Sequence, residues 1–180
     1  MQGASWLAGL CFLLFAGTVQ ALELGKQRSD YQASPDLRWL EAAPGELSPE
    51  QALEALRSGK GQRLGSRYPA MGFREQDQWF LLSLDNQSDT GLWYLRAGRP
   101  HLDYLDLYIY DAAGTLLRHQ RSGDRVPFAE RPFPHHQLVF PLAIPQQAQW
   151  SVLFRARGDN VIDFPLSIRA PDEFNQHDGY

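Results

Sequence analysis

The stretch from His101 to Gly114, HLDYLDLYIYDAAG, decides the fold class of this chain. Along a β-strand, successive side chains point to opposite faces of the sheet. One face of this strand would therefore be aliphatic, while the other would carry tyrosines and one aspartate. The aliphatic set is Leu105, Leu107 and Ile109, and the second set is Tyr104, Asp106, Tyr108 and Tyr110. The pattern predicts a strand of a two-faced antiparallel sheet, with the aliphatic face toward a core.

Similar short segments recur along the chain, separated by clusters of turn-forming residues. Beyond a first strand near 37–40, we expect strands at 79–84, 92–97, 102–110, 115–120, 137–142, 150–156 and 161–168. Gly158-Asp159-Asn160 is typical of a hairpin turn and would join the last two strands. Trp79 and Trp93 alternate with polar neighbours and are expected in the core. Short strands at this regular spacing predict an all-β fold, a jelly-roll β-sandwich like those of carbohydrate-binding modules.

One short helix is expected before these strands, over residues 49–58. Ser48 suits the cap position, Pro49 suits the first helical position, and Gln51 can complete a capping box. Gly59 can end the helix, because glycine readily adopts the left-handed conformation that follows a helix. The prediction is therefore a sandwich with one short N-terminal helix.

The first 21 residues resemble an export signal. Trp6–Ala16 is an apolar run of suitable length, and Val19-Gln20-Ala21 offers a small-x-small cleavage pattern. An uncleaved anchor is the alternative, but this run is too short to span a bilayer. Cleavage would remove Cys11, the only cysteine, so the mature chain would have no disulfide. We expect a periplasmic protein with a folded domain at 22–174 and a tail at 175–180.

Composition and motifs exclude several classes of function. Lys and Arg number 17 against 21 Asp and Glu, for a formal net charge of −4, and no basic cluster stands out. Nucleic acid is therefore not expected as a partner. The chain lacks a phosphate loop, a nucleophile elbow and a zinc-protease motif, so no residue is assigned a catalytic role. His135 and His136 point apart in an extended segment and are expected to be solvated loop residues.

Calcium is an open alternative as a bound cofactor, while no other cofactor is expected. Oxygen ligands crowd two predicted loops, with Asp85, Asn86 and Asp89 in one and Asp103 and Asp106 in the other. Clustered hard oxygen ligands can hold calcium. Loops rich in Asp and Asn are also ordinary turns, so the metal ligands stay unassigned.

The tyrosine face of the 104–110 strand is the main candidate for ligand binding. Aromatic rings stack on the apolar faces of sugars, while carboxylates and guanidinium groups bond hydroxyls. The candidate ligand-binding residues are Tyr104, Asp106, Tyr108, Tyr110, Arg131 and Arg155. The structural alternative is that these tyrosines are half-buried strand residues, since tyrosine favours strands. A loop-anchoring role is the corresponding alternative for Arg131.

Four sequence segments, taken in order, resemble a known family. They are WFLLSLDNQSD at 79–89, LWYLRAGRPHLDYLDLYIYDAAG at 92–114, SGDRVPFAERPFPHHQLVFPL at 122–142 and SVLFRARGDNVIDFPLSI at 151–168. The most specific pieces are Asp106-Leu107-Tyr108, Arg131-Pro132, Phe140-Pro141-Leu142 and Arg155. This order is similar to the type-two extracellular sensory domain of bacterial seven-transmembrane receptors with diverse intracellular signalling modules. The resemblance covers about 39–174.

The resemblance implies a periplasmic sensory sandwich that senses glycans or other small ligands, and calcium in some members. It implies attachment to the inner membrane through a region beyond this chain, with a histidine kinase or diguanylate cyclase as output. Residues 175–180 would then be a juxtamembrane run-in or a tail, and a homodimer is a further expected partner state. The rival hypotheses are an autonomous carbohydrate-binding module, a calcium-responsive sensor and a glycan-processing enzyme.

Overall fold

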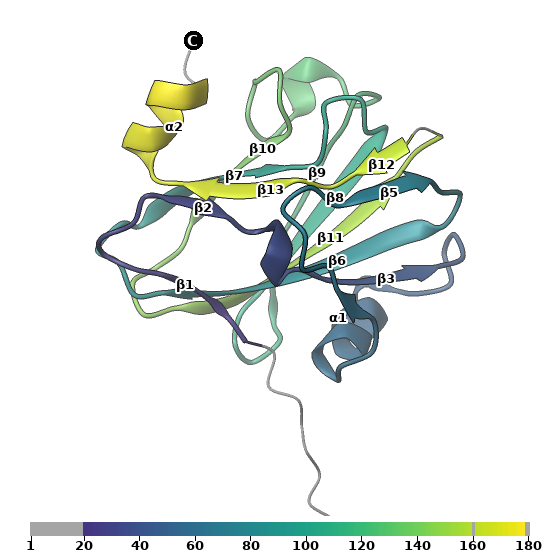
Figure 1. Ribbon diagram of the computed structural model, residues 1–180, viewed down its shortest axis with the longest axis horizontal. Helices are drawn as coiled ribbons and strands as arrows, with labels where there is room; N and C mark the ends of the chain where they lie inside the picture. Colours follow the sequence, from purple (N-terminus) through teal and green to yellow (C-terminus); the bar gives the residue numbers. More distant parts are fainter. Residues whose placement is uncertain (1–19, 160, 179–180) are drawn as a thin grey trace, which may run out of the picture.

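The computed structural model of the chain describes residues 20–159 and 161–178, which form two β-sheets packed face to face (Figure 1). The predicted export signal at 1–21 lies almost wholly outside these described residues. The layers, the antiparallel pairing and the short strands confirm the prediction of an all-β jelly-roll sandwich.

The larger sheet has seven strands. Its path runs β4 (Gln62–Arg63), β3 (Arg38–Ala42), β6 (Asp77–Asn86), β11 (Gln149–Arg157), β8 (Tyr104–Tyr110) and β9 (Leu116–Ser122). Off this path, β1 (Leu22–Leu24) pairs in parallel with β6. β8 pairs antiparallel with both β11 and β9, so the strand that carries the tyrosines is an interior strand of this sheet.

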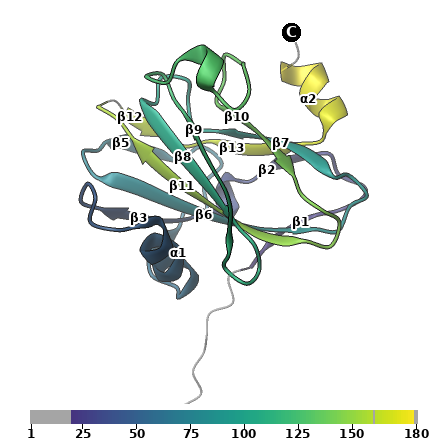
Figure 2. The same ribbon diagram turned by 180° about the vertical axis from the view of Figure 1, so that it is seen from behind.

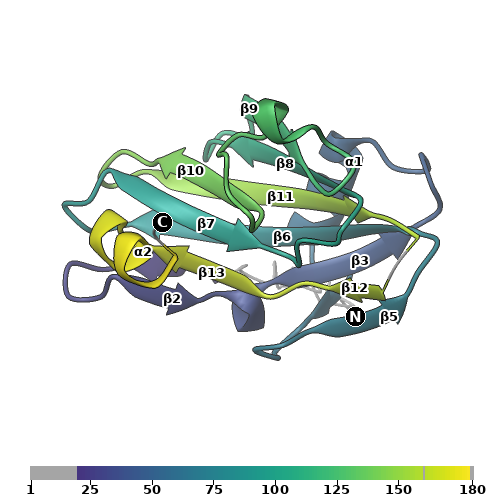
Figure 3. The same ribbon diagram turned by 90° about the horizontal axis from the view of Figure 1, so that it is seen from above.

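The smaller sheet has four strands, in the order β10 (Val139–Ala143), β7 (Leu92–Ala97), β13 (Leu166–Arg169) and β2 (Asp30–Gln32). A separate ribbon of β12 (Val161–Asp163) and β5 (Ala70–Phe73) lies at one end of the sandwich (Figure 3). Two short 3-10 helices, η1 (Ser34–Asp36) and η2 (Phe128–Glu130), lie in the connections.

The core lies between the two sheets and is built from alternate residues of their strands. The aliphatic face of β8 is part of it, since Leu105, Leu107 and Ile109 are buried. The rings of Phe80 and Phe164 stack with their centroids 4.0 Å apart and join β6 to the chain before β13. Trp93 is in this core, whereas Trp79 is buried in a second cluster on the outer face of the larger sheet. Both tryptophans are therefore core residues, as predicted.

The hairpin predicted at Gly158-Asp159-Asn160 is wrong. β11 belongs to the larger sheet, and β12 pairs with β5 in the separate ribbon. The chain leaves the sheet at Gly158, and the Asp159 backbone N–H donates a 3.1 Å hydrogen bond to Asp103. Residue 160 lies outside the described residues. Turn-forming residues suit a crossing between layers as well as a hairpin, because both require a sharp change of chain direction.

The predicted helix is present as α1 (Pro49–Arg57). Ser48 caps it, and Ser48 and Gln51 form the reciprocal capping box. α1 lies against the outer face of the larger sheet, whereas a second helix, α2 (Pro171–Asp178), lies over the smaller sheet (Figures 1 and 2).

The sequence patterns did not predict α2. It begins with a proline and two acidic residues, which suit a helix N-terminus. The buried Phe174 ring stacks on Tyr94 of β7 with centroids 4.3 Å apart. The boundary predicted at 174 therefore falls within a helix that packs on the sandwich. Among the described residues, neither helix has the length and apolar character needed to cross a membrane.

Candidate functional site

Helix α1 covers one half of the outer face of the larger sheet and leaves the other half open. Its buried residues Ala52, Leu53 and Leu56 pack into one cluster with side chains from β6, β8 and β11. The Arg57 guanidinium fixes the helix end by donating 2.9 Å to the Ser151 hydroxyl on β11. The second face of β8 is therefore divided into a part sealed by the helix and a part available to solutes.

Two of the predicted ligand-binding tyrosines lie in the sealed part. Tyr108 is 6% exposed and Tyr110 is 1% exposed, both packed in the cluster beneath α1. The predicted ligand-binding role of Tyr108 and Tyr110 requires exposed rings, and the structure does not provide them, because the helix buries its hydrophobic stripe on these rings. Burial of the hydroxyl, with the nearby Glu50 carboxylate as a second cause, raises the pKa of Tyr110 to about 12. These two rings contribute to packing, the alternative stated for them above.

Asp106 is the electrostatic centre of the open part. Its side chain is fully buried, and its carboxylate accepts a 2.7 Å hydrogen bond from Arg121 of β9 and a 3.0 Å bond from Arg155 of β11. The His119 ring lies 3.0 Å away and Arg157 lies 3.6 Å away. The sheet register creates this cluster, because Arg121 and Arg155 are the direct cross-strand partners of Asp106.

Burial of the Asp106 carboxylate opposes its ionisation, but hydrogen bonds from its cationic neighbours outweigh that effect. The bonds from Arg121, His119 and Arg155 hold the pKa of Asp106 below its ordinary value. The aspartate is thus an ionised anchor that orients arginine side chains, and it is inaccessible to a solute. The outer parts of Arg121 and Arg157 stay exposed, at 45% and 36% of their side-chain surface.

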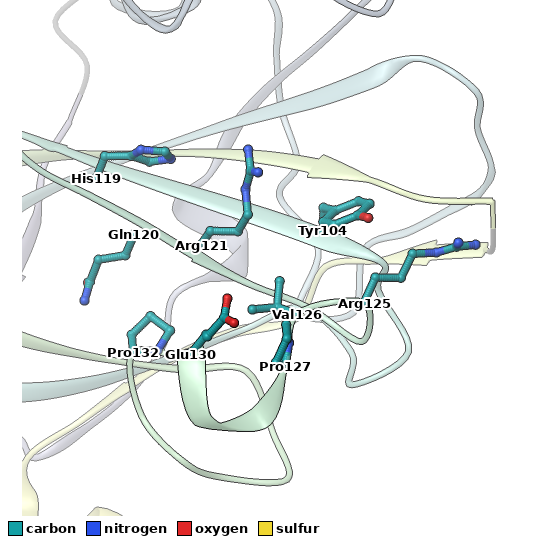
Figure 4. A pocket seen from close by; sticks show the side chains of 9 residues that line it. All are labelled: Tyr104, His119, Gln120, Arg121, Arg125, Val126, Pro127, Glu130 and Pro132. Atoms are coloured by element: carbon teal, nitrogen blue, oxygen red, sulfur yellow. The ribbon is translucent and has the colours of Figure 1, made fainter.

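Tyr104 is the predicted tyrosine that a solute can reach, and two adjoining hollows meet at it. The first has a volume of about 490 Å³ and lies between β9 and the connection that follows it (Figure 4). Its lining residues are Tyr104, His119, Gln120, Arg121, Arg125, Val126, Pro127, Glu130 and Pro132. In Figure 4 the residues of the connection face those of β8 and β9 across this hollow.

The second hollow has a volume of about 430 Å³ and shares Tyr104 and Arg125 with the first. It adds acidic side chains and Arg157 to the lining, so acceptors and donors lie side by side; the acidic residues are Glu75, Asp77, Asp103 and Asp159. The Tyr104 ring lies 5.9 Å from the Arg121 guanidinium and 5.6 Å from that of Arg157. A ring flanked by cations and by both hollows is the arrangement of a candidate solute site.

Arg131 and Arg155, the predicted arginines, have supporting positions. Arg155 lies over the Trp79 ring at 5.4 Å and donates a 3.0 Å hydrogen bond to Asp106. Arg131 donates a 3.3 Å hydrogen bond to the Val126 carbonyl and lies 5.6 Å from the Phe128 ring. It therefore braces the connection that lines the first hollow, in line with its loop-anchoring alternative.

Sequence reasoning missed His119, Arg121, Arg125 and Arg157. The alternation of Leu117, His119 and Arg121 on one side of β9 was the available signal. Only the register shows that this side joins Asp106. The expectation of a solvated His135 is also wrong, since His135 is 2% exposed and packs beside Phe133 and Phe174.

The predicted calcium loops form ordinary polar contacts in the structure. The buried Asn86 amide donates 2.9 Å hydrogen bonds to the carbonyls of Thr90 and Ile144, as in a turn-bracing residue. Asp103 pairs with Arg125 at 3.2 Å. Within residues 20–159 and 161–178, no three His, Cys, Asp or Glu side chains converge as a metal site would require. Calcium binding stays a prediction.

Replacement of Tyr108 by leucine is expected to lower the free energy of unfolding by about 1–2 kcal/mol, as for lost aromatic packing in a core. The substitution keeps an apolar side chain under α1 but removes the ring that stacks on His119, with centroids 4.4 Å apart. Urea unfolding measures the change. A variant of unchanged stability that binds solutes more weakly would show instead that Tyr108 contacts ligand.

The chain belongs to the 7TMR-DISM extracellular 2 family, whose family model matches residues 34–170. This family is an extracellular sensory domain of seven-transmembrane receptors and is not itself catalytic. Membership confirms the resemblance found in the sequence and implies a periplasmic, membrane-attached position. No curated protein sequence matches the chain significantly.

Solved structures give distant similarities. A xylan-binding module, CBM15, shares 9% identity at a TM-score of 0.37, over 79% of this chain and 96% of that chain. The K2 cleaved adhesin domain of Lys-gingipain shares 14% sequence identity at a TM-score of 0.32, over 79% of this chain and 87% of that chain. A structure of carbohydrate-binding modules from the β-sandwich superfamily shares 11% sequence identity at a TM-score of 0.30, over 79% of this chain and 54% of that chain.

Proposed function

We propose that this domain is the periplasmic ligand-binding part of a bacterial transmembrane signalling receptor of the histidine kinase or diguanylate cyclase type. It binds a glycan or another small solute on the open half of the larger sheet. The observation that carries the proposal is the pair of hollows that meet at the partly exposed Tyr104 ring. The family match supports the sensory role.

The chemistry of the hollows suits a polyhydroxylated ligand. The Tyr104 ring offers an apolar face for stacking, and guanidinium donors and carboxylate acceptors stand on both sides of it. The Asp106 carboxylate holds Arg121 and Arg155 in place before a ligand arrives, which reduces the entropy lost on binding. Binding would signal by favouring one of two states of the domain or of a dimer contact.

The test is a thermal-shift screen of the protein against sugars, amino acids and divalent ions including calcium. A specific ligand stabilises the folded state by mass action and raises Tm. Tyr104→Ala should then weaken binding of that ligand about three- to tenfold, the worth of one aromatic contact, while unfolding stays nearly unchanged.

Tyr68→Ala is the matched control, because Tyr68 is 71% exposed and lines a different hollow. If Tyr68→Ala abolished ligand binding and Tyr104→Ala did not, the ligand would bind at a site other than the hollows at Tyr104. Absence of any ligand in the screen, or turnover of a glycan by the purified protein, would contradict the proposal.

A carbohydrate-binding module that does not signal is the second candidate. It uses the same Tyr104 site, so binding alone does not separate the two functions. A receptor-deletion strain complemented with the Tyr104→Ala receptor distinguishes them. A sensor requires its ligand-dependent output to change with this substitution, whereas a module without signalling would leave the output unaffected.

A further inference from the structure

A third hollow lies on the opposite side of the sandwich and shares no lining residue with the Tyr104 site. It has a volume of about 440 Å³ and is bounded by strands of the smaller sheet and by the 67–68 segment. Its lining residues are Gln32, Arg67, Tyr68, Arg96, Gly98, Arg99, Gln137, Pro165 and Arg169. Four of these nine are arginines, and none is acidic.

The arginines reach this hollow from separate parts of the chain. Arg96 is on β7 and Arg169 is on β13, and the two strands pair with each other. Arg67 lies before β5, and Arg99 follows the turn at Gly98, where φ is +71°. Such a gathering of like charges from four segments is costly unless counter-ions offset it, because like charges repel at close range.

Carboxylates lie beside this lining, and its arginines differ in exposure. Asp30 pairs with Arg169 at 3.3 Å, and Asp163 lies 3.9 Å from Arg99. Arg169 is held firmly, with 12% of its side chain exposed, whereas the Arg99 side chain is 50% exposed and Arg67 is exposed. The hollow thus combines one largely buried guanidinium with the exposed side chains of Arg67 and Arg99, which present their charge to the solvent.

We propose that this hollow binds a phosphate group carried by a small molecule or a lipid headgroup. Guanidinium forks donate paired hydrogen bonds to tetrahedral oxyanions, and several forks can share one phosphate. The glutamines and the exposed Tyr68 can bond the remainder of the ligand. The hollow lies on the same sheet as α2, and membership in a membrane receptor family brings phospholipid headgroups within reach as one source of phosphate.

The experiment titrates the protein with inorganic phosphate and glycerol phosphate by calorimetry, and with vesicles of phosphatidylglycerol or phosphatidylcholine by co-sedimentation. The double substitution Arg67→Gln, Arg99→Gln is expected to weaken phosphate binding at least about tenfold, since each removes a charge-assisted hydrogen bond. Both side chains are exposed, so the variant should unfold at the same urea concentration as the parent.

The matched control is Arg74→Gln, Arg118→Gln, which removes the same charge outside this hollow. If the protein binds glycerol phosphate and only Arg67→Gln, Arg99→Gln weakens this binding, the phosphate group comes from a soluble small molecule. Binding restricted to phosphatidylglycerol vesicles, again lost only with the first pair, supports the headgroup. Absence of binding to every probe, or an equal loss in the control, overturns the proposal. Neither result bears on Tyr104, so the sensory site is judged separately.

Discussion

Replacement of Asp106 by asparagine is expected to lower the free energy of unfolding by about 3 kcal/mol, near the lower end for breaking a buried ion pair. The carboxylate is fully buried and accepts from Arg121 and Arg155 at 2.7 and 3.0 Å. An amide cannot neutralise these guanidinium groups, and Arg155 is too buried to be rehydrated freely. The effect stays at the lower end because Arg121 and Arg157 retain access to water. Urea unfolding at neutral pH measures it.

Asp159→Asn is the control for this substitution, because Asp159 is 88% exposed although it also contacts an arginine, Arg125. It should leave the unfolding midpoint unchanged, as expected for an exposed ion pair. If Asp106→Asn and Asp159→Asn lowered the free energy of unfolding equally, burial of Asp106 would not be the reason for its contribution to stability.

The difference in stability between the parent protein and Asp106→Asn depends on pH in a defined way. The pKa of Asp106 is lower in the folded chain than in the unfolded chain. The stabilising contribution of its ionised carboxylate is therefore complete at any pH above the ordinary aspartate pKa of about 3.9. This contribution is lost as the pH falls through the lower pKa of the folded state. The stability difference between the parent protein and Asp106→Asn should therefore be constant near pH 7 and shrink on acidification below about pH 4. A difference that grows with acid would contradict this assignment.

Phe164→Ala is expected to lower the free energy of unfolding by about 4 kcal/mol, in the range found when buried phenylalanines are truncated. The ring is fully buried, stacks on Phe80 at 4.0 Å and meets Phe154 edge-on at 5.3 Å. Its removal leaves a cavity between the two sheets that close packing prevents from collapsing. The midpoint of urea unfolding and Tm should both fall.

Phe128→Ala is the matched control, since Phe128 is 53% exposed and lies on η2 at the surface. It should change stability by no more than about 0.5 kcal/mol. Equal losses for the two substitutions would mean that the contacts between the sheets do not determine stability.

The fold could be predicted from the sequence because its dominant signal is local. Alternation along β8 placed its aliphatic residues correctly, and the capping residues around Ser48 gave the position of α1. The crossing after Gly158 and the helix α2 could not be predicted in the same way. A turn sequence does not specify which strand comes next to it, and α2 is short with a single buried anchor, Phe174.

The site was harder to predict, because it depends on pairing between strands distant in sequence. Periodicity identified Tyr104, Asp106, Tyr108 and Tyr110 as one face, and the structure agrees with that grouping. It could not show that α1 seals half of the face. It also could not show that Arg121 and Arg157 join Arg155 at Asp106, since that approach requires the register of β8 with β9 and β11.

The partial cover provided by α1 has a consequence for how this domain can diversify. Residues under the helix are constrained by the hydrophobic seal, as Tyr110 and Leu153 show. The tips of Tyr104, Arg121 and Arg125 lie beyond that constraint. Arg121 and Arg125 also pair with the buried Asp106 and Asp103. Substitution at Tyr104 is therefore the change expected to alter the proposed solute preference at little cost to folding, so related receptors can retain one scaffold while they acquire different specificities.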